Sequence, residues 1–197
     1  TSLDYADRHV AELVKVLSEP LAVSEYRAAF RPRLVIAGHD LKFILPALPK
    51  LRTLFEIRID EWPSEVRFDQ SHSDACLAWA DYVWVEWLTA ASVWYAERVR
   101  PTQELVTRFH RYELGRSYGD VIRRESVSAF VAIAPHCFED LVERFDIPRS
   151  QVRYVPNFYF VDDYEQADPN DSDRLFRLAM IGSVPRRKGF LKALELL

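Results

Sequence analysis

Short apolar runs alternate along the chain with longer stretches in which apolar residues recur every three or four positions. The short runs predict buried strands, whereas the three-to-four spacing predicts amphipathic helices. Strands that alternate with helices form βαβ units, so the pattern predicts an α/β fold with a Rossmann-like parallel sheet and flanking helices. Six strands are expected, at residues 34–37, 54–59, 82–85, 104–109, 127–133 and 152–155.

The helical pattern occupies the stretches before and between these strands. Pro46 and Pro49 each lack a backbone donor, so the helix between the first two strands is expected to be irregular. The most apolar long stretch, residues 75–96, contains Asp81 and Glu86 and is unsuited to crossing a bilayer. Helices are predicted over residues 4–18, 41–51, roughly 71–80 and 137–145, with another after Trp87.

Polar residues gather where the predicted strands end. Gly-His-Asp follows the first strand, Glu-Trp the third and His-Arg-Tyr-Glu the fourth. The carboxyl ends of parallel strands meet at one edge of the sheet, where open α/β sheets bind their ligands. Loops are polar in any protein, which is the competing interpretation. We expect one cleft lined by His39, Asp40, Asp60, Glu61, Glu86, His110, Arg111 and His136.

Composition narrows the class of protein. With 49% hydrophobic residues, the 197-residue chain can bury a core, and its net charge of −4 argues against a general nucleic-acid binder. Cys76 and Cys137 are the only cysteines, too few for a disulfide scaffold or a cysteine zinc site. Both stand in apolar surroundings, so we expect buried free thiols and a reducing compartment.

A basic loop near the C-terminal end is the main candidate for anion binding. An apolar run stops at Gly182, the loop carries Arg186, Arg187 and Lys188, and helical spacing resumes after Gly189. A strand, a tight turn and a helix in this order direct unpaired backbone N–H groups and the positive end of the helix dipole at the loop. A phosphate or diphosphate is the expected ligand, and a solvated basic turn is the alternative.

The composition changes between the sixth strand and this loop. Residues 158–174 are acidic and rich in turn-forming residues, which is typical of a linker. We therefore expect a first Rossmann-like domain over residues 1–157, the linker, and the truncated start of a second such domain over residues 175–197. The chain begins without Met and stops inside a predicted helix, so we expect a piece of a longer protein.

The order of these motifs resembles that of bacterial retaining glycosyltransferases of the family-4 type, whose GT-B fold has two Rossmann-like domains. The resemblance covers most of the chain. It rests on the unit around His110, the Val-Pro-Asn turn at residues 155–157, the acidic linker, and Ile-Gly followed by Arg-Lys-Gly within residues 181–189. Two positions depart from the family pattern: Ser183 replaces a basic residue, and Phe158 replaces the glycine of a Pro-Asn-Gly turn.

The resemblance implies roles for particular residues. The first domain would bind the acceptor, and the second would bind a nucleotide-diphospho-sugar. The donor diphosphate would contact Lys188, with Gly182, Arg186 and Arg187 beside it. His110 matches the family position near the reacting sugar and is the catalytic candidate. The candidates for the acceptor cleft are His39, Asp60, Glu86 and Arg111.

Tryptophan and arginine positions add secondary expectations. Trp62 and Trp87 follow strand ends and are candidates for stacking on a sugar in the cleft. Trp79, Trp84 and Trp94 are expected in the core. A group of arginines is expected on a solvated face, with an acceptor-side or membrane-side basic patch as the alternative: Arg98, Arg100, Arg108, Arg111, Arg116, Arg123 and Arg124.

The function implied by the resemblance is transfer of a sugar from a nucleotide-diphospho-sugar to a saccharide or glycan acceptor, in cell-surface polysaccharide biosynthesis. The reaction would be retaining and metal-independent, with no cofactor, and His39, His72 and His136 lack metal-ligand spacing. The partners would be the nucleotide sugar and the glycan, without nucleic acid, in the cytoplasm or peripherally at the inner face of the membrane. A GT-B-fold nucleotide-sugar epimerase and a non-catalytic binding module are the alternatives. The isolated fragment is expected to be inactive, and its donor, acceptor and oligomeric state stay open.

Overall fold

The structure is a computed structural model that describes residues 31–158 without a break, together with residues 11–12, 15, 189, 191–192 and 195. Contacts divide the chain into two units, Thr1–Val161 and Asp162–Leu197. Most of the predicted N-terminal helix lies outside the described residues, and residues 11–12 and 15 of it are helical. Nearly all of the linker and the strand of the second domain also lie outside the described residues. The domain boundaries given above stay predictions.

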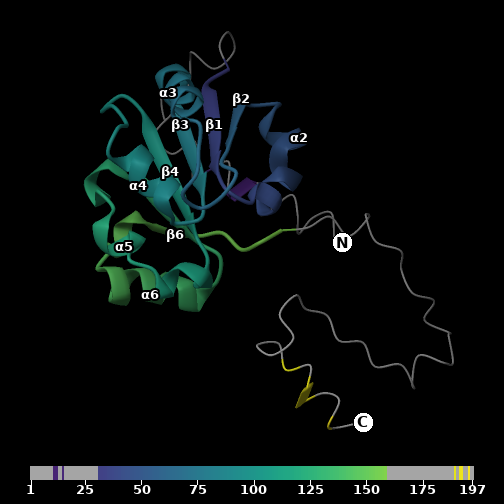
Figure 1. The fold of residues 1–197 in the computed structure, drawn as a ribbon, viewed down its shortest axis with the longest axis vertical. Helices are drawn as coiled ribbons and strands as arrows, with labels where there is room; N and C mark the ends of the chain where they lie inside the picture. The colour runs from purple at the N-terminus through teal and green to yellow at the C-terminus, as the bar shows by residue number, and fades with distance from the viewer. Residues whose placement is uncertain are drawn as a thin grey trace, which may run out of the picture. The chain divides into compact units, whose positions relative to one another are not determined.

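The first unit contains a six-stranded sheet in which every neighbouring pair of strands is parallel (Figure 1). The spatial order is β2-β1-β3-β4-β5-β6. All six predicted strands are present, so the α/β fold with a Rossmann-like sheet is confirmed. The strands are β1 Arg33–Gly38, β2 Glu56–Glu61, β3 Tyr82–Glu86, β4 Glu104–Phe109, β5 Ala129–Ala132 and β6 Val152–Tyr154.

One face of the sheet packs under four helices. Successive side chains of a strand point to opposite faces, so alternate residues such as Val35, Val83 and Phe130 enter the core on this side. Apolar residues of the helices complete the same buried cluster. The helices follow β2, β3, β4 and β5 in the chain (Figure 1): α3 Gln70–Trp79, α4 Ala90–Ala96, α5 Tyr118–Val121 and α6 Pro135–Phe145.

The other face carries a second core, formed by strand residues of opposite parity. The segment after β1 packs there as three short pieces, η2 (Leu41–Phe43), η3 (Leu45–Ala47) and α2 (Leu48–Leu51). Pro46 and Pro49 account for the missing regular helix, as predicted. The remaining elements are single turns: η4 Arg111–Gly115, η5 Arg124–Ser126 and η6 Arg149–Gln151.

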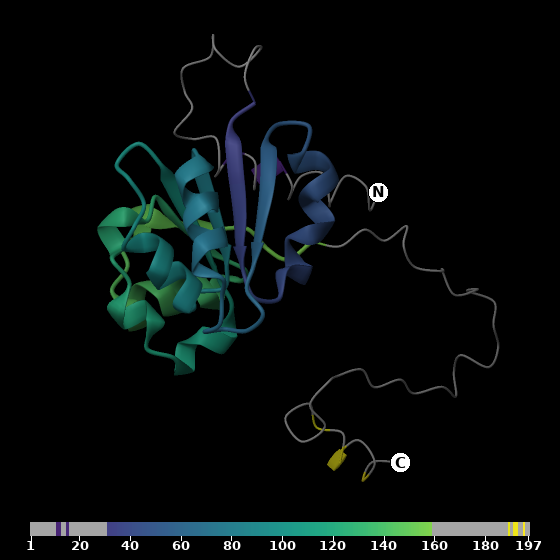
Figure 2. The same cartoon turned by 45° about the horizontal axis from the view of Figure 1, so that its top comes forward.

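The direction in which the chain winds reverses at β1. From β1 the chain passes to β2 on one side, whereas β3 to β6 follow one another on the other side. The connection from β1 to β2 packs on one face of the sheet, and the helices between the later strands pack on the other, as right-handed crossovers require. Figure 2 shows β1 and β2 side by side and pointing the same way. Sheets of this kind bind ligands in the crevice at the carboxyl ends of the strands that flank the reversal, here β1 and β3.

Several predictions of burial can be compared with the fold. Cys76 and Cys137 are buried and form no disulfide, as predicted. Trp84 and Trp94 lie in the core, but Trp79 is only half-buried, with its ring under the guanidinium of Arg58 at 4.2 Å. Within the described ranges, no helix has the length and hydropathy needed to cross a membrane.

Candidate functional site at the carboxyl edge of the sheet

The carboxyl ends of β1 and β3 approach each other closely at Gly38. This glycine has φ of +124°, and a Cβ there would stand 2.5 Å from the backbone oxygen of Glu86. Glycine avoids the clash and adopts this backbone region without strain. The last residue of β1 therefore lies directly against Glu86, the last residue of β3, and this contact sets the separation of the two strand ends at the switch point.

Glu86 is the centre of a buried polar network at this edge. Its side chain is fully buried and shares a sheet face with Trp84, two residues earlier. Oε1 lies 2.9 Å from His110 Nε2 and 3.4 Å from Arg108 Nη1. Oε2 accepts a hydrogen bond from Trp84 Nε1 at 2.9 Å. A carboxylate can stay charged in such a buried place only because donors of this kind replace water.

Arg108 supplies the positive charge opposite Glu86. The two residues are paired in the register of β3 and β4, and Arg108 is only 1% exposed. Its Nη2 donates to Asn157 Oδ1 at 2.6 Å, and its Nη1 lies 3.4 Å from the backbone oxygen of Phe43. The expectation that Arg108 lies on a solvated face is therefore wrong. Strand alternation turns it inward with Val106.

His110 follows β4 directly and is 4% exposed. A carboxylate only accepts hydrogen bonds, so Nε2 carries the proton in the contact with Glu86. Burial lowers the pKa of His110, and this effect outweighs the opposing one of Glu86. The imidazole is therefore neutral at pH 7 and held in one tautomer by the carboxylate behind it.

Glu113 joins the two loops that carry the site. It forms a capping box with His110 at the start of η4. Its Oε1 accepts backbone hydrogen bonds from His110 at 3.2 Å and from Leu88 at 3.0 Å, residues that follow β4 and β3. Burial raises the pKa of Glu113 to about 8, so its carboxyl group is mostly protonated at neutral pH. Its Oε2 is buried without a hydrogen-bond partner among the described residues.

Two residues with left-handed backbones follow β1 and β3 and are in direct contact. Asp40 has φ of 55° and Trp87 has φ of 74°, and Trp87 Nε1 donates to the backbone oxygen of Asp40 at 3.0 Å. A bulky residue in this region is an outlier that costs about 1–3 kcal/mol. The indole stacks on the His110 imidazole with ring centroids 4.0 Å apart, and the Phe43 ring lies 5.0 Å from that imidazole.

The structure gathers most of the predicted acceptor-cleft residues at this edge. Glu86 touches His110, and the His39 ring lies 5.9 Å from the Trp87 ring. Arg111 is the exposed first residue of η4, directly after His110. These residues come from the ends of β1, β3 and β4, which are neighbours in the sheet. Their shared edge agrees with the sequence, and their role in binding an acceptor stays a prediction.

Asp60 and Trp62 belong to the opposite face of the sheet. Asp60 is 2% exposed and accepts hydrogen bonds from Tyr95 Oη at 2.6 Å and from Trp62 Nε1 at 3.1 Å. Burial, together with the Asp60 charge, raises the pKa of Tyr95, which therefore stays a neutral donor. Trp62 is 2% exposed and stacks on Phe68 at 4.1 Å, so its assignment to the cleft is wrong.

The basic loop is described only at its end. Gly189 has φ of 75°, and the backbone nitrogen of Glu195 donates to the oxygen of Leu191 at 3.1 Å, the spacing of an α-helical turn. A turn glycine followed by helical backbone is what the sequence predicts after the loop. The residues predicted to bind the donor diphosphate lie outside the described residues: Gly182, Arg186, Arg187 and Lys188.

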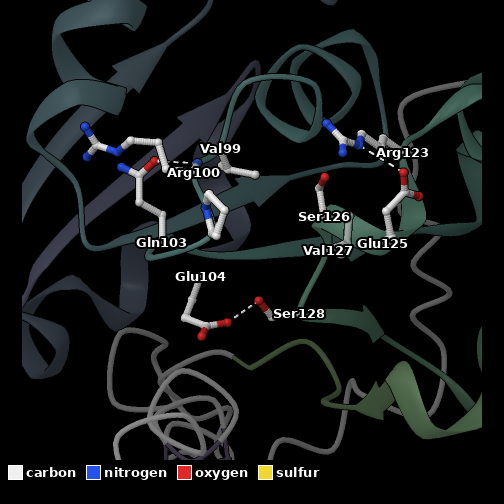
Figure 3. Close-up of a pocket in the computed structure, with 10 residues that line it drawn as sticks. Val99, Arg100, Gln103, Glu104, Arg123, Glu125, Ser126, Val127 and Ser128 are labelled. Carbon is white, nitrogen blue, oxygen red and sulfur yellow. Dashed lines mark hydrogen bonds and ion pairs between the residues drawn. The ribbon is translucent and has the colours of Figure 1, made fainter.

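A separate hollow of ≈ 400 Å³ lies at the amino ends of β4 and β5 (Figure 3). Arg100 and Arg123 stand on opposite sides of it. Arg123 Nε donates to Glu125 at 2.9 Å, and the Ser128 hydroxyl donates to Glu104. Positive and negative side chains balance in this hollow, so it indicates no particular class of ligand, and it lies away from the edge where such sheets bind ligands.

In the part of the chain that the structure describes, no group of three or more His, Cys, Asp and Glu side chains is arranged to hold a metal ion. Neither the protein-family models nor the curated proteins include a match to this chain. The geometry of the carboxyl edge and the order of the sequence motifs are therefore the features that bear on function.

Proposed function

We propose that this protein is a nucleotide-sugar-dependent glycosyltransferase whose first domain binds the acceptor. The observation that supports this most is the buried contact of 2.9 Å between His110 and Glu86, the last residue of β3 at the topological switch point. Open α/β sheets bind their ligands at this place, and His110 is the residue that the motif resemblance puts beside the reacting sugar. The donor, acceptor and linkage are left unspecified by this proposal.

The charge state of His110 suits the proposed chemistry. Cleavage of a sugar–phosphate bond develops positive charge on the sugar, as in other glycosyl transfers. A neutral imidazole with a carboxylate behind it does not repel that charge, whereas an imidazolium would. Glu86 in this proposal orients the ring and favours its approach to the sugar, in the way a buried carboxylate orients a catalytic histidine.

The leaving group requires the opposite charge. Departure of the nucleoside diphosphate leaves negative charge on its phosphates. In the proposal, Lys188 and the neighbouring Arg186 and Arg187 stabilise that charge together with the N-terminus of the helix that follows Gly189. This assignment comes from the resemblance and from the basic loop in the sequence.

The test is turnover of nucleotide sugars by the full-length protein. Given a panel of UDP-, GDP- and ADP-linked sugars, the wild type is expected to release a nucleoside diphosphate from at least one of them. Lys188→Ala is expected to abolish release, because the diphosphate loses its main cation. His110→Ala is expected to lower kcat by about 100-fold or more. The matched control is Lys192→Ala, an exposed lysine on the helix just beyond the loop.

Different outcomes separate the competing functions. Full activity of Lys188→Ala would contradict the role of the basic loop. Conversion of the donor to an isomeric nucleotide sugar without any acceptor would identify an epimerase. Absence of heat on titration with each of the nucleoside diphosphates would favour a non-catalytic binding module.

A further inference from the structure

The carboxyl edge holds aromatic rings that the proposed transfer chemistry does not use. The Phe43 and Trp87 rings lie 5.6 Å apart, and the Tyr112 ring meets Trp87 edge-on at 6.4 Å. These three residues, the aromatic edge cluster, come from the segments that follow β1, β3 and β4. Tyr112 is 46% exposed, and Phe43 and Trp87 are half-buried. Their rings therefore remain partly accessible beside His110.

Trp87 holds its position against the preference of its backbone. All five tryptophans are described, and three of them lie in the core. Trp79 is half-buried and covered by Arg58. Trp87 alone combines partial exposure with a left-handed φ of 74°. Glycine would adopt this conformation without strain, so the strained backbone is compensated by contacts of the indole, among them its hydrogen bond to Asp40 and its stacking on His110.

Polar groups surround the aromatic edge cluster. Nδ1 of His39 is buried and has no hydrogen-bond partner in the described part of the chain, although the ring lies beside Trp87. Asp40 and Lys42 form an ion pair of 2.5 Å at the same strand end. An apolar ring face with hydrogen-bonding groups around it matches a pyranose, whose C–H face is apolar and whose hydroxyl groups project from its rim.

We infer that Trp87, with Phe43 and Tyr112, is the stacking platform for a pyranose ring of the acceptor saccharide. The inference rests on the proposed function, which assigns the acceptor to the first domain and the nucleotide to the second. The platform determines acceptor specificity and places the sugar ring next to His110.

The experiment is an NMR titration of the full-length protein with methyl pyranosides of glucose, galactose, mannose and N-acetylglucosamine. The indole N–H signal of Trp87 is the reporter, assigned by its loss in Trp87→Gly. At least one pyranoside is expected to shift this signal in a saturable way in the millimolar range. Followed by the signal of the sugar, Trp87→Gly weakens that binding about tenfold or more, whereas Trp87→Phe retains most of it.

Two controls keep the test decisive. Trp79→Phe changes the other half-buried tryptophan, under Arg58, and is expected to leave sugar affinity unchanged. Glycine relieves the strain at position 87, so Trp87→Gly is expected to stay folded by circular dichroism. If Trp87→Gly unfolds, the wild type provides the test through magnetisation transfer from the indole protons of Trp87 to the C–H protons of the sugar. Absence of this transfer overturns the platform.

The remaining outcomes distinguish this inference from the proposed function. Full affinity in Trp87→Gly, no shift with any pyranoside, or a shift with nucleosides alone overturns the platform. Pyranoside binding without turnover of any nucleotide sugar supports the platform and rejects the transferase. Turnover with an unchanged acceptor KM in Trp87→Gly supports the transferase and rejects the platform.

Discussion

Glu86 and Asp60 are both buried carboxylates at the carboxyl edge of the same sheet, yet their surroundings differ in kind. Asp60 faces the core beneath α3 and α4 and accepts hydrogen bonds from two neutral donors, Tyr95 and Trp62. The largely exposed ring of His72 lies 4.0 Å from the other carboxylate oxygen of Asp60. Glu86 faces the other core and is bound by the charged Arg108, the titratable His110 and one indole. Neutral donors hold a carboxylate in place, whereas Glu86 also fixes the tautomer of the histidine beside it.

The difference follows from strand parity. Side chains of neighbouring strands alternate between the two faces, so two strand-end carboxylates reach opposite cores when their parities differ. Glu86 shares the face of Trp84, whereas Asp60 lies on the face of Val35 and Val83. A polar residue at a strand end is therefore evidence for a site only when its face and its partners are known.

Removal of the Glu86 charge should lower the free energy of unfolding more than any other change considered below. Glu86→Gln keeps the shape of the side chain but leaves the buried Arg108 without a counter-charge, which is expected to cost about 3–5 kcal/mol of unfolding free energy. Urea unfolding followed by circular dichroism measures the loss. A loss under about 1 kcal/mol would mean that Arg108 is neutralised by something other than Glu86.

Gly38 tests the closeness of the two strand ends. Gly38→Ala forces a Cβ against the backbone oxygen of Glu86 at a φ of +124°, and is expected to cost about 3 kcal/mol. Gly115→Ala is the matched control, because a Cβ at Gly115 meets nothing within 4 Å, and its effect should stay within about 0.5 kcal/mol. Equal thermal unfolding midpoints for the two variants would contradict the close approach at the switch point.

Glu113 should make the stability of the site depend on pH. A carboxyl group with its folded pKa raised to about 8 stabilises the fold fully below its unfolded pKa, near 4.3, and loses that contribution as the pH rises toward 8. Glu113→Gln imitates the protonated form and has no such dependence. Relative to wild type, the variant is expected to gain on the order of 2–3 kcal/mol between pH 5 and pH 8.

Glu113 and His110 change the stability of the protein with pH in opposite directions, so the direction of the change tells which residue causes it. The lowered pKa of His110 contributes stability that is complete above its unfolded pKa, about 6.5, and is lost as the pH falls through the folded pKa. His110 and Glu113 therefore act in opposite directions. A difference between Glu113→Gln and wild type that is constant from pH 5 to pH 8 would mean that Glu113 is ionised in the folded protein.

Asp60→Asn should have the smallest effect on stability. Tyr95 and Trp62 both donate to Oδ2 of Asp60, so an amide oxygen in that place can accept both hydrogen bonds, although more weakly than a carboxylate. No buried cation is left unpaired, so a loss of about 1–2 kcal/mol is expected. Tyr95→Phe is the partner variant that removes one of those bonds. A loss as large as that of Glu86→Gln would remove the distinction between the two carboxylates.

The strands, their order along the chain and the shared edge could be predicted from the sequence, because an apolar run marks a buried strand and a proline interrupts a helix at the place where each stands. The faces of Asp60 and Glu86 could not be predicted. Strands such as β3 are buried on both sides and apolar throughout, so their sequence carries no alternation that marks a face. The carboxyl ends of parallel strands share one edge of the sheet, and this rule predicted that Glu86 and His110 lie close together. The structure shows the two side chains 2.9 Å apart.

Arg108, Glu113 and Asn157 were missed as members of the site. An arginine inside an apolar strand is itself a signal, since a buried charge needs a partner, and Arg108 could have been identified in this way. Asn157 is 49 residues away in the chain and meets Arg108 only through the packing of β6 with the rest of the sheet. The raised pKa of Glu113 arises from burial, which local sequence does not reveal.

The role of Glu86 is best tested by the turnover of nucleotide sugars in two variants of the full-length protein, Glu86→Gln and Asp60→Asn. Glu86→Gln is expected to lower kcat by about 100-fold or more, because His110 loses the carboxylate that orients it. Asp60→Asn is predicted to stay within about threefold of wild type under conditions where both variants are folded. Equal losses in the two variants, or full activity in Glu86→Gln, would contradict the assignment of the catalytic edge to Glu86 and His110.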